Sequence, residues 1–185
     1  MGGGVVIKLE GIGAVNEALK ALEREFGAKT VQGKVLVPSV REAMQPVLSA
    51  AISNAPRDTG GLALSLQVEA RRPTNKDRRS KYITQTDTVI AAVTTASGKK
   101  LARMSEGKGL LRARKRLAKM GFDNPESFTG VKSDARVVAQ EFGTARNGAK
   151  PYLRPALEAN AQSTVNRLGQ ILARRIAEFR SKQGK

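Results

Sequence analysis

The chain contains no cysteine and no histidine among its 185 residues. Without Cys there is no disulfide and no thiolate metal site, and the redox compartment is not indicated. Without His there is no imidazole zinc site, no Ser-His-Asp triad and no histidine general base. These two absences remove the commonest metal-site and nucleophile chemistries from the functions that the sequence can support.

Aromatic residues and long apolar runs are also scarce. Aromatics make up 4% of the chain and Trp is absent, so a core must be built from Leu, Val, Ile and Ala. An apolar content of 40% supports a folded protein, and the length fits a single domain over residues 1–185. No apolar run approaches the ~18 residues of a membrane span, so no membrane partner is expected.

The first residues, 1–6, lack the charged and apolar regions of a signal peptide and the Ser or Thr of a myristoylation signal. A cytoplasmic location is therefore the expectation.

The net charge is +17, from 33 Lys and Arg against 16 Asp and Glu. Such a charge promotes association with polyanions, either nucleic acid or an acidic protein surface. The plainer interpretation is a basic, well-hydrated surface.

Apolar periodicity predicts helices towards both ends of the chain. After a short strand over 5–9, Val15, Leu19, Leu22 and Phe26 share one helical face, and Gly27 is a plausible stop. A second helix is expected from Ser39, a good N-cap, to Asn54, and Pro46 should either kink it or move its true start later. A long helix over about 155–180 carries an apolar stripe, part of which is expected to face another subunit.

Three segments are expected to form strands: 62–68, 84–95 and 135–142. The residues from Arg71 to Ser80 form a charged loop between the first two. The natural arrangement is an antiparallel sheet of three or four strands covered by helices. The predicted fold class is therefore α+β, with a small antiparallel sheet packed by N-terminal helices and a long C-terminal helix.

A basic insert of about residues 97–133 separates the second predicted strand from the third. Its apolar spacing favours a basic amphipathic helix, and a flexible arm is the alternative. Glu106 is the one acidic residue between Gly98 and Met120. The insert is the candidate surface for contact with DNA or a protein partner. Its nine basic residues are Lys99, Lys100, Arg103, Lys108, Arg112, Arg114, Lys115, Arg116 and Lys119.

The segment from Asn54 to Gly61 predicts a rigid corner between a helix and a strand. Pro56 ends the helix, because it has no N–H and disfavours helical geometry in the residue before it. Asp58 and Thr59 can accept backbone N–H bonds in a tight turn, and Gly60 supplies left-handed angles. Phosphate binding by the glycines is the alternative, but the phosphate-loop pattern of Gly, Lys and Ser or Thr is missing.

A second segment, Glu141-Phe142-Gly143-Thr144, is expected to end the last strand. Phe142 is predicted to fill the core. Glu141 could act as a catalytic acid, but a lone carboxylate is more often an ion-pair member, and Arg154 is the candidate partner. Pro151 and Pro155 stiffen the start of the last helix, where Pro155 suits the first turn.

These two segments, in this order and near this spacing, resemble the tail-completion family of long-tailed bacteriophages, which includes minor tail protein Z-like and head–tail joining neck proteins. The resemblance covers about residues 35–180. It rests on Ala55 to Ser65 and on Glu141 to Leu157, with Pro56, Asp58, Thr59, Gly60, Glu141, Phe142, Gly143, Thr144, Pro151, Arg154 and Pro155 as structural motif positions. The chain departs from the family pattern at Val137 to Gln140, where an aromatic residue is usual, and in the size of the basic insert.

The resemblance implies an α+β structural protein of the virion neck or tail with no enzymatic activity and no cofactor. It implies a homo-oligomeric ring, six-fold or twelve-fold, that joins neighbouring neck, connector and tail-tube proteins around the DNA channel. Assembly would take place in the cytoplasm of the bacterial host. Whether such a ring is a tail terminator or a completion protein stays open.

Two other functions are alternatives to the neck protein. One is a basic nucleic-acid-binding protein that uses the insert as an arm, although no recognised nucleic-acid-binding motif accompanies the charge. The other is an enzyme such as a magnesium-dependent nuclease. Its candidate carboxylates stand in unrelated contexts, at Asp58, Asp77, Asp87, Asp123 and Asp134.

Overall fold

A computed structural model describes residues 13–57, 60–131, 135–146 and 148–184. The first half comprises α1 (Gly13–Phe26), α2 (Ala28–Val31), the π-helical turn η1 (Gln32–Leu36), α3 (Val37–Ala43), α4 (Gln45–Asn54), α5 (Gly61–Ser65), β1 (Leu66–Arg71) and the 3₁₀ turn η2 (Asp77–Arg79). The second half comprises β2 (Ile90–Thr95), α6 (Gly98–Met104), α7 (Gly107–Lys119), the 3₁₀ turn η3 (Pro125–Ser127), α8 (Ala135–Phe142) and α9 (Leu153–Lys182).

The chain divides into two compact units, each made of segments that are distant in sequence. The first unit takes residues 1–46, 68–92 and 160–185, and the second takes 47–67 and 93–159. Both strands and α9 contribute residues to both units. The single domain expected over 1–185 stays a prediction.

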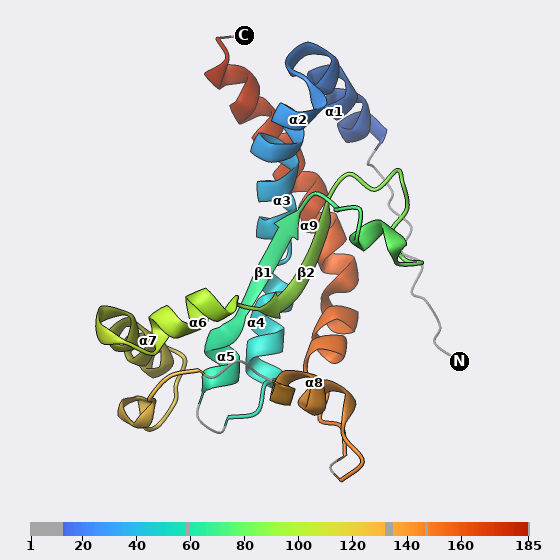
Figure 1. Cartoon of the computed structure of the whole chain (residues 1–185). Helices are drawn as coiled ribbons and strands as arrows, with labels where there is room; N and C mark the ends of the chain where they lie inside the picture. Colours follow the sequence, from blue (N-terminus) through green and yellow to red (C-terminus); the bar gives the residue numbers. More distant parts are fainter. Residues whose placement is uncertain (1–12, 58–59, 132–134, 147, 185) are drawn as a thin grey trace. The chain divides into compact units, whose positions relative to one another are not determined.

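The core of the first unit joins the two ends of the chain. Leu22 of α1 and Val31 of α2 are fully buried with Leu172, Ile176 and Phe179 of α9. The rings of Phe26 and Phe179 meet edge to face with their centroids 5.2 Å apart. In Figure 1, α1 and α2 lie beside the C-terminal part of α9. The predicted helix with an apolar face ending at Gly27 and the predicted long C-terminal helix are both confirmed.

The second predicted helix is longer and more broken than expected. Helical structure already begins at Ala28, so Ser39 lies inside a helix and is not an N-cap. Its buried hydroxyl donates to the Val35 carbonyl, 2.7 Å away. The break comes at Met44, two residues before Pro46, because proline has no N–H and clashes with the preceding turn. The expected kink is therefore confirmed, and the N-cap assignment is wrong.

The sheet is smaller than the three or four strands expected. In the described residues it contains two antiparallel strands, β1 and β2, which run side by side (Figure 1). The predicted first strand, 62–68, begins as the helix α5, and the predicted second strand is paired only from Ile90. Leu66 of β1 is buried with Ala51 of α4 and Ala156 of α9. The α+β class and the packing by helices are confirmed.

The predicted third strand is wrong, because residues 135–142 form the helix α8. The strand expected over 5–9 lies outside the described residues. No helix in the described part of the chain combines the length and hydropathy that crossing a membrane requires.

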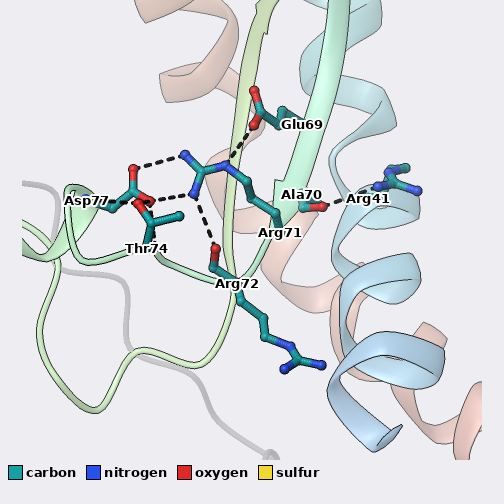
Figure 2. Close-up of polar contacts among 7 residues, drawn as sticks. All are labelled: Arg41, Glu69, Ala70, Arg71, Arg72, Thr74 and Asp77. Carbon is teal, nitrogen blue, oxygen red and sulfur yellow. Dashed lines mark hydrogen bonds and ion pairs between the residues drawn. The ribbon is translucent and has the colours of Figure 1, made fainter. Parts of the chain in front are cut away.

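An arginine at the end of β1 fixes the charged loop that follows it. The Arg71 guanidinium donates to Glu69 Oε1 at 2.7 Å and to Asp77 Oδ1 at 2.9 Å (Figure 2). Asp77 Oδ2 accepts the Thr74 N–H at 2.7 Å, while the Thr74 hydroxyl accepts the Asp77 N–H, as in a helix capping box. Hydrogen bonds from Arg71 and Thr74 hold the pKa of Asp77 well below its usual value. The loop is therefore held by the hydrogen bonds and ion pairs of Arg71 and Asp77.

A second charge cluster joins α3 to α9. Glu42 accepts hydrogen bonds from Arg174 at 2.6 Å and from Arg175 at 2.7 Å. The Arg175 and Arg174 bonds lower the pKa of Glu42 from its ordinary value of 4.5. A carboxyl group whose pKa is lower in the folded state stabilises the fold above its ordinary pKa and loses that contribution as the pH falls.

We expect the free energy of unfolding to decrease as the pH falls below about 4.5, and the variant Glu42→Gln to show a smaller decrease than the wild type. Chemical denaturation at pH 7 and at several acidic values measures both. If the free energy of unfolding depended equally on pH in the two proteins, Glu42 would not contribute to that dependence.

Candidate functional site

The first motif segment joins two helices, not a helix and a strand. After α4 ends at Asn54, Ala55 is buried and Pro56 is half-buried. Asp58 and Thr59 lie outside the described residues. Gly60 has a φ of 73° and caps the N-terminus of α5, so its left-handed conformation agrees with the prediction. The predicted helix-to-strand corner is corrected to a corner between α4 and α5, with β1 following at Leu66.

This corner also holds the basic insert. A Cβ atom on Gly60 would lie 2.4 Å from Leu117 Cδ2 and 3.1 Å from the Phe122 ring, so α7 packs directly on the glycine. Arg57 donates to the Gly121 carbonyl at 3.3 Å, and its guanidinium carbon lies 5.4 Å from the centroid of the Phe122 ring. Arg57 is not among the predicted site residues, because no local pattern in the sequence indicates a contact with Gly121, which lies 64 positions later.

The second motif segment is organised around the Glu141 carboxylate, which is 3% exposed. Oε2 accepts the N–H groups of Tyr152 and Leu153, both at 2.9 Å. Oε1 accepts the Arg154 N–H at 3.1 Å and the Arg154 Nε at 3.0 Å. These backbone groups are the free N–H groups at the start of α9, so Glu141 caps a helix to which it is not adjacent in sequence.

The electrostatics of Glu141 follow from these contacts. Burial raises the pKa of the carboxyl, but the Leu153 and Tyr152 N–H groups and the Arg154 side chain outweigh it and lower the pKa overall. Glu141 is therefore ionised at neutral pH and saturated with donors, as a capping group is. The predicted ion pair with Arg154 is confirmed. The arrangement leaves no proton on Glu141 for acid catalysis near pH 7.

The neighbours of Glu141 differ from the prediction in one respect. Phe142 does not fill the core: its side chain is 67% exposed, and the Arg154 guanidinium carbon lies 5.1 Å from its ring centroid. The Gly143 N–H closes α8 by donating to Ala139 at 2.8 Å, and the Thr144 hydroxyl accepts the Arg146 N–H. Pro151 is exposed just before α9, and Pro155 lies in its first turn, as predicted.

The two motif segments meet in one core within the second unit. Ala55 of the first segment is buried with Tyr152 and Ala156 of the second, together with Ala51 and Leu66. Tyr152 is fully buried. Residues nearly 100 positions apart in the sequence thus form one core, which we call the scaffold. Helix α7 packs against the corner at Gly60, and α8 is joined to the start of α9 by Glu141.

Exposed apolar side chains gather beside this scaffold. Val138 is 61% exposed and Phe142 67%, and their spacing of four places them on one face of α8. Leu157, 49% exposed, follows Arg154 by one turn on α9, and Arg154 stacks on Phe142. We call Val138, Phe142 and Leu157, together with Arg154, the apolar strip. The apolar strip is not predicted from the sequence, which places Phe142 in the core.

The insert is helical, as the first of the two alternatives predicted. Leu101 of α6 and Ala113 and Leu117 of α7 are buried with Phe128 and Val131, and with Leu64 of α5. Among its basic residues, Arg114 donates to the Phe128 carbonyl at 3.1 Å and pairs with Glu126, and Lys100 donates to Gln67 at 2.7 Å. These two are structural. The remaining seven are exposed: Lys99, Arg103, Lys108, Arg112, Lys115, Arg116 and Lys119.

Among the described residues, no three His, Cys, Asp or Glu side chains cluster closely enough to hold a metal ion. Two of the carboxylates considered for a nuclease accept hydrogen bonds from neighbouring residues. Asp77 accepts from Arg71 and Thr74, and Asp87 accepts the Thr84 N–H at 2.6 Å. Asp58 and Asp134 lie outside the described residues. No protein-family model, curated protein or solved structure matches the chain.

Proposed function

We propose that this protein is a structural component of a bacteriophage neck or tail, which forms a homo-oligomeric ring at the head–tail junction around the DNA channel. Its role would be tail completion or termination, in contact with the connector and tail-tube proteins, and no cofactor would take part. The family resemblance of the two motif segments suggests this function. The apolar strip is the observation in the structure that carries it.

The apolar strip fits an assembly surface because its exposure is unfavourable in a monomer. Burying a Phe or Leu side chain is worth roughly 1.5–3 kcal/mol, and this gain is not realised while the strip faces water. Adjacent exposed apolar residues rimmed by polar ones mark interaction sites more often than isolated ones do. An arginine stacked on an aromatic ring is also typical of interface centres.

The support beneath the strip is suited to the same role. Val138 and Phe142 lie on α8, whose end is tied to α9 by the Glu141 cap. It is also tied to the loop before α9 by the Lys150 N–H, which donates to the Gln140 carbonyl at 2.8 Å. A surface held this firmly loses little conformational entropy when a partner binds. The second copy of the chain is the occupant that the ring requires.

The double substitution Val138→Ser and Phe142→Ser tests the assembly. We expect the wild type to give the mass of six or twelve subunits by native mass spectrometry and sedimentation, and the double variant to give a monomer. Loss of two apolar contacts at each interface corresponds to several kcal/mol per subunit pair. The matched control is Tyr82→Ser, which removes a side chain that is 80% exposed on the first unit.

Unchanged ring mass in the double variant would show that the apolar strip is not the assembly surface. A wild type that stays monomeric and is absent from the neck of virions examined by electron microscopy would contradict the proposed function itself. Far-ultraviolet circular dichroism of each variant checks that the helices are retained.

A further inference from the structure

The basic residues of α7 are arranged as a continuous stripe on one face of the helix. Lys108, Arg112, Lys115 and Lys119 follow one another at intervals of four, three and four, and Arg116 lies beside them. At 100° per residue these five side chains fall within an arc of about 100° and extend over about 16 Å of helix. We call them the cationic stripe. No acidic residue occurs between Gly107 and Lys119.

The cationic stripe is not used by the fold. All five side chains are exposed, and within the described part of the chain none of them forms a hydrogen bond or an ion pair with another residue. Arg114, on the inner side of the same helix, contrasts with them because it is bound by Phe128 and Glu126. Five like charges on one face repel one another, so their placement costs stability unless an anion neutralises them.

The opposite face of α7 limits what this anion can be. Ala113 and Leu117 are 4% and 1% exposed, and they pack against Leu101, Phe128 and Val131. A helix that binds a membrane surface must offer a broad apolar face to the lipid, and here the apolar face is buried in protein except for Leu111, which is 58% exposed at the edge of the stripe. The stripe is therefore available mainly for electrostatic contact.

We propose that the cationic stripe of α7 binds the phosphate backbone of double-stranded DNA without sequence specificity. An α-helix is 10–12 Å wide, close to the ~12 Å width of the major groove, so the five cations can reach phosphates along its edges. Each strand of duplex DNA presents one negative charge per ~3.4 Å, close to the spacing of five cations over about 16 Å of helix. The helix contains no Asn or Gln, the residues that read adenine. This inference goes beyond the proposed function and does not depend on ring formation.

The test compares two variants of the full chain that each lose five positive charges from the net +17. The stripe variant carries Lys108→Gln, Arg112→Gln, Lys115→Gln, Arg116→Gln and Lys119→Gln. The control variant carries Lys20→Gln, Arg24→Gln, Arg167→Gln, Arg180→Gln and Lys182→Gln, all at exposed helical positions of the first unit. Gln has nearly the helix propensity of Lys and Arg, so the helices should be retained.

Binding is measured by fluorescence anisotropy with a labelled duplex of about 30 base pairs, at salt concentrations from about 50 to 200 mM. We expect the stripe variant to bind at least about thirtyfold more weakly than the wild type, and its slope of log affinity against log salt to be smaller by about 4.5, since each neutralised phosphate contributes about 0.9. The control variant should stay within about threefold of the wild type. Two duplexes of unrelated sequence should bind equally well.

Equal losses in the stripe and control variants would overturn the inference, because net charge alone would then account for the binding. Wild-type affinity for poly-glutamate equal to that for DNA would also overturn it and favour an acidic protein partner. If the stripe variant does not fold, the triple variant Lys108→Gln, Lys115→Gln, Lys119→Gln should lower the salt slope by about 3, and an unchanged slope would overturn the inference. Ring mass, measured separately, reports on the proposed function.

Discussion

Replacing Gly109 with Ala should destabilise the protein by about 3 kcal/mol, although the same change in an open helix stabilises it. Gly109 lies in the first turn of α7, where a Cβ atom would stand 1.7 Å from the carbonyl oxygen of Arg103 and 2.8 Å from its carbonyl carbon. These are backbone atoms of α6, so the contact is relieved only if the two helices move apart. That movement would open the core around Leu101 and Leu117.

Gly169 provides the matched control. It lies inside α9, and a Cβ atom there would meet nothing within 4 Å. Gly169→Ala should therefore increase the free energy of unfolding by about 0.8–1 kcal/mol, through helix propensity alone. Chemical denaturation of the two variants should give changes of opposite sign. A stabilising effect of Gly109→Ala would mean that α6 and α7 are not packed closely at their junction.

Replacing Glu141 with Gln should cost about 3 kcal/mol and lower the melting temperature by about 6–12 °C. The amide has almost the shape of the carboxylate, so no cavity forms. Its NH₂ group, however, would face donors on Arg154 or on Tyr152 and Leu153, all of which now bind carboxylate oxygens. The start of α9 would then have buried N–H groups without acceptors, and the negative charge that favours a helix N-terminus would be lost.

The variant Arg154→Gln separates the two parts of this site. The Arg154 side chain is 55% exposed, so its ion pair with Glu141 is screened by water and should contribute no more than about 1 kcal/mol. The backbone bonds remain in that variant. If Arg154→Gln destabilised the protein as much as Glu141→Gln, the ion pair would be the main contribution and the capping argument would fail. Differential scanning calorimetry of both variants at pH 7 gives the comparison.

The sequence predicted the long helices well because their apolar periodicity is unambiguous. Leu22 on α1 and Leu172, Ile176 and Phe179 on α9 all lie on predicted faces, and all four are buried together. The break near Pro46 followed from proline chemistry alone. In such segments the local pattern and the tertiary packing agree, so the pattern alone is sufficient to predict the helix.

The errors came from short segments whose pattern fits two structures. Residues 135–142 contain the β-branched pair Val137 and Val138, which favours a strand, but they also contain helix formers, and eight residues cannot decide between the two. The helix is compatible with Glu141 reaching the start of α9, a contact between residues 11 to 13 positions apart. Phe142 was assigned to the core because most phenylalanines are buried.

The candidate surfaces were predicted to different degrees. The basic residues of the insert and the Glu141–Arg154 pair were identified from the sequence, because charge and residue type are visible there. The anchoring by Arg57 and the apolar strip were not, because they depend on which segments meet in space. Binding of a second copy of the chain by the apolar strip, and of DNA by the cationic stripe, stays a prediction.

The core shared by α1, α2 and α9 has a consequence for how the protein is made. The apolar faces of α1 and α2 emerge from the ribosome before α9, because Leu172, Ile176 and Phe179, which cover them, are translated more than 100 residues later. The nascent chain must therefore expose this apolar surface until α9 has been translated, and chaperones would bind it during that interval. The first unit can be completed only after α9 has been released.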